Sequence, residues 1–462
     1  MSTRLERDSL GTKRVPSAAY YGIQTLRASE NFPISDLRLP IEIIRAYVLI
    51  KKAAASANRT VGWLRPRLAR AIQRACDEVM QGRFDSHFVV DAYQAGAGTS
   101  TNMNVNEVIA NRANELLGRR RGTYQPIHPN DHVNMGQSTN DTFPTAMQLA
   151  CLMVLPALVE AAGHLSATLA RKGRQFDGIV KSGRTHLQDA VPVRLGREFR
   201  AYALAVRKSA DDIERAGRAL RELNLGATAV GTGMNAHPRY RALAIRELRR
   251  WLKLPLRPAR NLQERTQSMA DFGRLSGSVR SYALELIRVA NDLRLLSSGP
   301  NTGLGEIDLP AVQPGSSIMP GKVNPSIAEM VDMVGFQVLG HDATVAAAVQ
   351  AGQLELNVMM PVIAYNVLQS IRLLTTSSQA LADRCVTGIT AHRDRCEALA
   401  LRSLALVTAL APRVGYAHAA AIAKDALRTG RPIRELVVTR GVLTAAEARR
   451  VLDPVRLSRG TG

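Results

Sequence analysis

Long segments of helical periodicity constrain this chain more than any other feature. Apolar residues recur at helical spacing over 197–223, 263–296 and 359–381, and several of these segments are apolar on more than one face. A helix of that kind is buried against more than one neighbour, so we expect a bundle of long helices and association between subunits. Only 4% of the residues are aromatic, and a core of Ala, Leu, Val and Ile suits helix packing better than a β-rich fold. The sequence predicts a mostly α protein.

A loop-like stretch interrupts the helical periodicity between two of the predicted long helices. "SYALELIRVANDLRLLSSGP" is predicted to end at Gly299 and Pro300, because glycine suits a left-handed cap and proline breaks a helix. Its predicted apolar face consists of Leu284, Ile287, Ala290, Leu293 and Leu296. The next helix follows Pro325, since proline is tolerated in a first turn. The stretch between them, "GSSIMPGKVNPS" at 315–326, has the composition of a loop that serves function.

The pattern changes twice along the 462 residues, a length that allows two or three domains. The first part mixes short helical and irregular pieces, long helices dominate from about Asn140, and shorter amphipathic helices fill the C-terminal part. We therefore predict three domains: an N-terminal domain at 1–139, a central helical bundle at 140–395 and a small C-terminal helical domain at 396–462.

The formal net charge of +22 raises nucleic acid as a possible partner. The arginines are spread along the helical segments, however, and the only tight cluster is "RRRG" at 119–122. No zinc-finger, basic-zipper or RRM-like stretch accompanies them. We expect no nucleic-acid-binding function, since a basic field also attracts a small dianionic substrate.

The sequence also gives little indication of a metal site, a cofactor site or a membrane segment. The four cysteines are scattered without zinc-type spacing, and neither a phosphate-binding loop nor a dinucleotide-binding glycine motif is present, so we expect no metal and no cofactor. The start of the chain lacks an apolar signal core, and the most apolar run, 150–159, is short and contains Pro156. This pattern predicts a cytoplasmic protein without a membrane segment.

Four polar, glycine-containing stretches interrupt the structured sequence. They are "GAGTSTNMN" at 96–104, "HPNDHVNMGQSTND" at 128–141, "GRTHLQDAVP" at 183–192 and "GSSIMPGKVNP" at 315–325. Hydroxyls, amides and one lysine can hold carboxylates without many compensating buried charges. Structural explanations remain for single residues: Ser138 to Asp141 can be a helix cap, His186 a structural histidine and Lys322 a solvated lysine.

The last of these stretches matches a specific signature. Residues 315–324 fit G-S-S-x-M-P-x-K-x-N in full, and the chain resembles the aspartase/fumarase superfamily from "LGTKRVPSAAYYGIQTLRASENFPIS" through "GQLELNVMMPVIAYN" to "GRPIRELVV". The resemblance implies a three-domain, mostly helical subunit whose long helices assemble into a homotetramer. It also implies active sites shared between subunits, with the 315–326 loop as a mobile lid.

The resemblance also implies a reaction, the reversible removal of ammonia from a succinyl compound to leave fumarate. Abstraction of a weakly acidic proton gives an enediolate dianion, which neutral preorganised donors stabilise. The resemblance assigns Ser316 as the catalytic base, Thr99, Ser138, Thr139 and Ser317 to the enediolate, Thr185, Lys322 and Asn324 to the other carboxylate, and Asn140 and catalytic His186 to the departing amine. A serine hydroxyl titrates far above neutrality, so the base needs help from loop N–H groups and Lys322.

Within the superfamily, "GAGTSTNMN", "YYGIQTLRA" and "LGATAVGTGMN" favour elimination of ammonia from L-aspartate. Hydration of fumarate, elimination from an N-substituted aspartate and a non-enzymatic crystallin role are the alternatives. Two features depart from the aspartase pattern. Ser182 stands where an apolar residue is usual, and the sequence "ERTQSMADF" differs from the usual one. These departures leave the choice of amine open.

Overall fold

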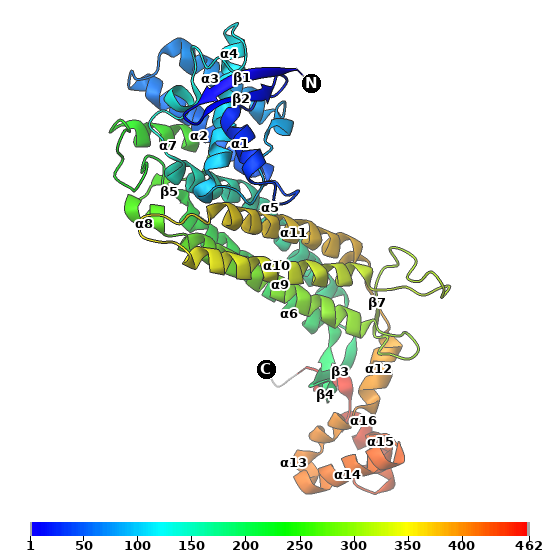
Figure 1. The fold of residues 1–462 in the computed structure, drawn as a ribbon. Helices are drawn as coiled ribbons and strands as arrows, with labels where there is room; N and C mark the ends of the chain where they lie inside the picture. The colour runs from blue at the N-terminus through cyan, green and yellow to red at the C-terminus, as the bar shows by residue number, and fades with distance from the viewer. Residues whose placement is uncertain (1, 460–462) are drawn as a thin grey trace. The chain divides into compact units, whose positions relative to one another are not determined.

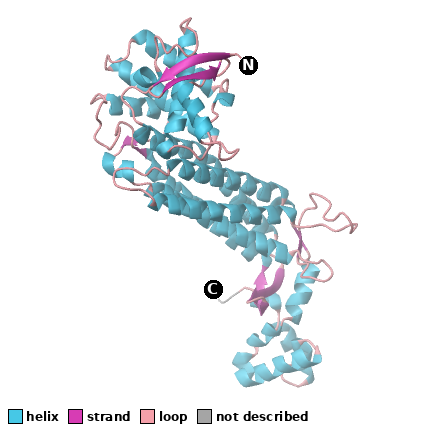
Figure 2. Cartoon of the chain, viewed as in Figure 1, coloured by secondary structure: helices cyan, strands magenta, loops and turns pink. Residues whose placement is uncertain are grey.

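The computed structural model describes residues 2–459, and helices make up most of it (Figures 1 and 2). The helices are α1 Ile23–Asn31, α2 Ile41–Thr60, α3 Pro66–Met80, α4 Thr99–Leu116, α5 Thr139–Gln175, α6 Leu195–Gly217, α7 Tyr240–Leu252, α8 Leu262–Gln267, α9 Ala270–Leu296, α10 Ser326–Gln350, α11 Met360–Arg384, α12 Arg393–Arg402, α13 Ala411–Val414, α14 Tyr416–Thr429, α15 Ile433–Thr439, α16 Ala445–Val451 and α17 Pro454–Leu457. The predicted mostly α class is confirmed.

The strands form small two-stranded sheets. They are β1 Thr3–Asp8 with β2 Gly11–Pro16, β3 Val180–Thr185 with β4 Gln188–Arg194, β5 Glu222–Leu223 with β6 Arg257–Pro258, and β7 Ile307–Asp308 with β8 Thr390–Ala391. Only the β5–β6 pair is parallel. The hairpins β1–β2 and β3–β4 were not predicted from the sequence.

Contacts divide the chain into two units. The first consists of Met1–Val159, Asp211–Ser281 and Phe336–Leu374, and the second of Glu160–Ala210, Tyr282–Gly335 and Thr375–Gly462. The predicted boundary at 139/140 coincides with the start of α5, and the one at 395/396 falls inside α12. The three-domain division remains a prediction.

Buried polar contacts join the long helices inside each unit. In the first unit, the Ser276 hydroxyl on α9 donates to Asp342 on α10 at 2.6 Å. In the second, the Tyr202 hydroxyl on α6 donates to Asp292 on α9 at 3.0 Å, and the Tyr282 and Ser378 hydroxyls of α9 and α11 are 2.7 Å apart. The long helices therefore pack as the expected bundle within each unit.

The buried face of α9 matches the predicted one in part. Ala290, Leu293 and Leu296 are buried as predicted, but Leu284 is 47% exposed, and the buried face continues through Leu286 and Val289 instead. The predicted residues were spaced by three throughout, and each step of three turns about 60° short of a full helical revolution, so such a row leaves the buried face. Alternating steps of four and three keep to one face, which explains the buried positions.

Helix α5 extends well beyond the apolar run at 150–159 and includes Pro156. By length and composition it is the one helix of the described residues that is apolar enough to cross a membrane, but 72% of its most apolar window is buried inside the protein. A core helix meets the same criteria, so this observation is weak support for a membrane segment.

Candidate functional site

The start of α5 gathers three of the predicted site residues. The Ser138 hydroxyl accepts a hydrogen bond from the Asn140 backbone N–H at 3.2 Å, and the Asp141 carboxylate accepts one from the Ser138 N–H at 3.0 Å. This reciprocal arrangement satisfies free donors at the helix start. The capping role expected for this stretch is therefore present, and it fixes Ser138 and Thr139 in place.

The buried carboxylate of Asp141 also anchors a neighbouring loop of the first unit. It accepts hydrogen bonds from the backbone N–H groups of Gly226 and Thr228 at 2.9 and 3.1 Å. Burial raises the pKa of Asp141 to about 6, although these donors oppose the shift. The same loop accepts a 2.8 Å hydrogen bond at the Ala229 carbonyl from the Asn140 amide nitrogen, which leaves the Asn140 amide oxygen as an acceptor.

A fully buried lysine lies beneath this helix start. Lys51 Nζ donates to the amide oxygens of Asn102, Asn134 and Gln137 at 2.8 to 2.9 Å. The Asn102 amide nitrogen then donates to Thr139 Oγ1 at 3.0 Å. An ammonium can only donate, so it orients all three amides. Burial lowers the pKa of Lys51 to about 7. We call these four residues, Lys51, Asn102, Asn134 and Gln137, the amide cluster.

Sequence analysis missed the amide cluster. The available signal was a lysine inside the run "VLIKKAAASA", where α2 is otherwise apolar and buried. Its neighbour Lys52 is partly exposed and forms an ion pair with Asp77. Two adjacent lysines on a helix face different directions, so one of them had to lie toward the core.

Thr99 stands at the first position of α4, next to a glycine that no other residue can replace without rearrangement. A Cβ at Gly98 would lie 1.9 Å from the Phe143 ring, and Gly98 has a φ of +82°. The start of α4 thus packs directly on the first turn of α5, which brings exposed Thr99 beside the cap.

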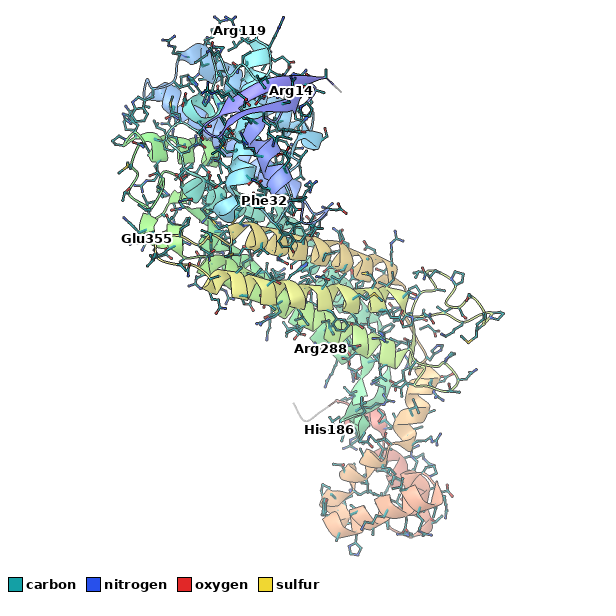
Figure 3. The ribbon with its side chains drawn as sticks, in the orientation of Figure 1. Arg14, Phe32, Arg119, His186, Arg288 and Glu355 are labelled. Carbon is teal, nitrogen blue, oxygen red and sulfur yellow. The ribbon has the colours of Figure 1, made fainter. Side chains whose placement is uncertain are left out.

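Two further predicted residues lie at the tip of the β3–β4 hairpin. Thr185 pairs with Gln188, and the turn residues His186 and Leu187 both have positive φ, at 57° and 59°. Left-handed conformations at two non-glycine residues are strained, and such strain gathers at functional sites. Thr185 and His186 are exposed, and Figure 3 labels His186 at this tip.

Buried charges hold the base of this hairpin. Arg184 binds the carboxylate of fully buried Glu306 through both terminal nitrogens at 2.9 and 3.0 Å. Lys181, 2% exposed, donates to Glu198 at 3.1 Å and lies 3.5 Å from Glu306. Sequence analysis did not identify these residues. Ser182, the departure from the usual pattern, is buried beside them.

The 315–326 stretch is a loop, as predicted, and it contains a special arrangement around Ser316. Ser316 Oγ accepts hydrogen bonds from the backbone N–H groups of Ile318 and Met319 at 3.2 and 3.0 Å. Two N–H groups directed at one oxygen stabilise negative charge on it. Ser316 Oγ thus already accepts hydrogen bonds from two backbone N–H groups of its own loop.

The neck of this loop is tied, while its tip is exposed. The Gly315 N–H donates to the Lys322 carbonyl at 2.8 Å, and the Asn324 side-chain nitrogen donates to the Gly315 carbonyl at 2.7 Å. A Cβ at Gly315 would lie 2.5 Å from that Lys322 oxygen. Ser317 and Lys322 are exposed. Asn324 therefore keeps one amide N–H and its amide oxygen free of the neck.

The predicted residues thus fall into three groups. Thr99 and residues 138–140 belong to the first unit, and the hairpin tip and the Ser316 loop both belong to the second. Between residues 2 and 459, no hydrogen bond joins that tip to the loop. Across the same residues, no group of three or more His, Cys, Asp or Glu side chains is suited to a metal ion.

Comparisons with known proteins identify the family of the chain. A family model described as "Lyase" matches residues 11–340, and one described as "Fumarase C C-terminus" matches residues 406–459. An aspartate ammonia-lyase of Pseudomonas fluorescens is 49% identical over 459 residues, which cover 98% of this chain and 95% of the relative.

Two solved structures have the same fold over almost the whole chain. A Brucella melitensis structure described as fumarate lyase:delta crystallin in native form has a TM-score of 0.92 at 50% identity, covering 98% of this chain and all of that one. A class II fumarase from Schistosoma mansoni has a TM-score of 0.96 at 38% identity and is covered over the full length of both chains.

Proposed function

The chain belongs to the lyase family of the aspartase/fumarase superfamily, and on that premise we propose that it eliminates ammonia from L-aspartate to give fumarate, reversibly. It is a carbon–nitrogen lyase. The full-length identity to an aspartate ammonia-lyase, which exceeds the identity to the fumarase structure, favours ammonia over water as the leaving group.

One observation carries the chemical step, the pair of N–H groups donating to Ser316 Oγ. A serine becomes a base only if its alkoxide is stabilised, and each unit by which its pKa falls corresponds to about 1.36 kcal/mol. The Ile318 and Met319 N–H groups already lie at hydrogen-bond distance, so no rearrangement of donors is needed when charge develops. As the base, Ser316 removes a proton from the carbon next to a substrate carboxylate.

The cap at α5 supports the second role, stabilisation of the enediolate. Thr99, Ser138 and Thr139 supply neutral hydroxyl donors, and Ser317 adds the loop backbone. Thr139 is held by Asn102 and, through it, by Lys51. Preorganised donors of this kind act most strongly where charge appears only in the transition state.

The remaining residues bind the other carboxylate and the amine. Thr185, Lys322 and Asn324 offer a hydroxyl, a cation and an amide for the carboxylate. Asn140 and His186 serve the amine: the free amide oxygen of Asn140 accepts a hydrogen bond from an ammonium, as does a neutral imidazole. Acceptors near the leaving group suit ammonia, whereas hydroxide departs only with a proton supplied to it.

We further propose a homotetramer whose active sites combine residues from different subunits. Exposed apolar residues on the long helices support association: Met333 is 68% and Phe336 59% exposed, and they lie on one face of α10. A cytoplasmic location is part of the same proposal, because the four cysteines are free and buried. Small-molecule substrate and like subunits are the proposed partners, with no nucleic acid.

The function is tested by following fumarate formation from L-aspartate and from L-malate with one enzyme preparation. We expect L-malate to be converted at least about a hundredfold more slowly, a difference of roughly 2.7 kcal/mol in transition-state energy. The Ser316→Ala variant, purified in parallel, measures any contaminating host enzyme. Equal or faster conversion of L-malate would identify a fumarase, and activity only with an N-substituted aspartate would identify the third class.

Shared sites are tested by mixing two inactive variants. Ser316→Ala and Thr185→Ala proteins are unfolded, combined and refolded, and mixed oligomers are confirmed by mass spectrometry. Partial recovery of activity is expected, since some sites then contain both intact residues. Mixed oligomers without recovery would contradict sharing of these two residues between subunits.

A further inference from the structure

A cavity in the first unit has no part in the proposed reaction. Its volume is about 550 Å³, within the range of small-molecule sites. It is lined by Trp63, Leu64, Arg65, Arg67, Leu68, Leu117, Arg119, Pro126, His132 and Met135. None of these residues is among those assigned to the substrate. The cavity therefore requires its own explanation.

Three arginines line this cavity without an acidic partner. Arg65, Arg67 and Arg119 form no side-chain hydrogen bond or ion pair within residues 2–459, and the lining includes no carboxylate. Arg119 is the first residue of the "RRRG" cluster and is labelled in Figure 3. Guanidinium groups match phosphate oxygens bidentately, so three of them on one cavity suit a multiply charged anion.

Nearby arginines behave differently. Arg112, on the same helix that leads to Arg119, binds Glu78 at 2.7 Å and Glu115 at 2.5 Å. Arg121, in the same cluster, lies 4.3 Å from the centre of the Tyr20 ring and donates to the Ala18 carbonyl. Partners are thus available in this region, and the three cavity arginines, like exposed Arg120, Arg70 and Arg74, form none of these contacts.

The rest of the lining is apolar and includes a large flat ring. Trp63 is 47% exposed, and its recorded ring contact is perpendicular, with His237 at 5.3 Å. Leu64, Pro126 and Met135 add apolar surface. An exposed indole stacks on a nucleobase with about 1–3 kcal/mol of stabilisation. The cavity hence combines a surface for a ring with charges for phosphates.

His132 adds a donor to this surface. Its Nδ1 accepts a hydrogen bond from the His128 backbone N–H at 3.0 Å, so the neutral ring carries its proton on Nε2. Burial lowers the pKa of His132, which keeps the ring neutral near pH 7.

We propose that this cavity binds a nucleoside polyphosphate, with the base on Trp63 and the phosphates on Arg65, Arg67 and Arg119. The limited volume of the cavity and its one exposed indole favour a small molecule over a nucleic-acid strand, which needs an extended basic path. The proposal does not depend on the proposed reaction, since binding is measured without turnover.

The test uses the fluorescence of Trp63 and calorimetry in parallel. The chain has two tryptophans, so Trp251→Phe leaves Trp63 as the only emitter. We expect titration with ATP at physiological salt to change its emission saturably, with a Kd below about 100 μM, and calorimetry to give the same Kd. Absence of saturable binding by both methods up to about 5 mM ATP would overturn the proposal.

A matched pair of double variants separates a site from a general charge effect. In the Trp251→Phe background, Arg67→Gln with Arg119→Gln should weaken ATP binding at least about tenfold. Arg70→Gln with Arg74→Gln removes the same charge from exposed positions of α3 outside the cavity and should change the Kd less than about twofold. Equal weakening in both would contradict the proposal.

The role of the ring is tested with inorganic triphosphate, measured by calorimetry. ATP should bind at least about tenfold more tightly than triphosphate, and Trp63→Ala should remove that difference. Triphosphate binding as tight as ATP binding would overturn the assignment of a nucleoside ligand.

Discussion

The cap region at the start of α5 and the Ser316 loop contain equally polar sequences, but they are held in opposite ways. Thr139 is buried and connected through Asn102 to buried Lys51, and Asp141 anchors a second loop. The Ser316 loop is tied at its neck, and beyond it residues 317–323 are exposed. Local stability follows buried contacts, so we expect the cap region to be the more rigid and the loop the more mobile of the two.

This difference suggests a division of labour. A developing dianion is stabilised best by donors that do not move, which the cap region provides. A base that must meet the substrate and then release product benefits from a segment that opens and closes. We therefore propose that half of the site is preformed and half is assembled when the loop closes.

The largest effect is expected at the base itself. Ser316→Ala should reduce kcat at least about a thousandfold while KM changes less than about threefold, since carboxylate binding by other residues remains. The adjacent Ser317→Ala, an exposed serine, is the matched control and should lose less than about tenfold in kcat. Steady-state kinetics with L-aspartate measure kcat and KM for both variants. Near-normal kcat in a folded Ser316→Ala protein would reject Ser316 as the base.

A smaller effect is expected in the preformed half. Lys51→Met removes the donor from the amide oxygens of Asn102 and Gln137, at a cost of about 1–3 kcal/mol each before relaxation, while the Asn134 amide oxygen still accepts from Asn102 and Asn106. We expect kcat/KM to fall at least about tenfold, along with a lower Tm, because Thr139 loses its fixed partner. Lys52→Met, which breaks an exposed ion pair with Asp77 and a contact over the Trp251 ring, should change both values little. Similar values for the two variants would show that the amide cluster does not support the site.

Substitution of two glycines of the loop should lower kcat, and the loss should be greater at Gly315 than at Gly321. Gly315→Ala places a Cβ 2.5 Å from the Lys322 carbonyl oxygen, so the neck must open. At Gly321 the space is open and only the positive φ of 80° opposes a side chain, at a cost of about 1 kcal/mol. Kinetics should show a greater loss of kcat for Gly315→Ala than for Gly321→Ala. The reverse order would contradict the role of the neck.

The smallest effect is a pH dependence of stability. Burial lowers the pKa of Lys51 to about 7 from 10.5, so between these values the unfolded chain binds more protons than the folded one. The stability that Lys51 contributes is therefore fully present only above pH 10.5 and is lost as the pH falls to about 7.

Urea unfolding of wild type and Lys51→Met at pH 7 and at about pH 9 measures this contribution. The free energy of unfolding of the wild type should increase relative to the variant at the higher pH. An unchanged or smaller difference would mean that Lys51 stays charged in the folded protein.

Local signals in the sequence sufficed for some of these features. The signature at 315–324 predicted the loop and its serine, and the polar run at 138–141 predicted a cap, because both depend on neighbouring residues. The Arg184–Glu306 pair joins residues 122 positions apart, and the three amides around Lys51 come from two other segments. No local pattern specifies such contacts, and the predicted face of α9 included exposed Leu284 because a row spaced by three drifts off the buried face.

Hydrogen–deuterium exchange distinguishes a preformed from an assembled half, by comparing peptides that cover 133–142 and 313–325 with and without the unreactive dicarboxylate succinate. The account predicts that the loop peptide exchanges rapidly in the free enzyme and at least about tenfold more slowly with succinate, while the cap peptide is protected in both states. A loop already protected in the free enzyme, or a cap region protected only with succinate, would contradict the division between a preformed and an assembled half.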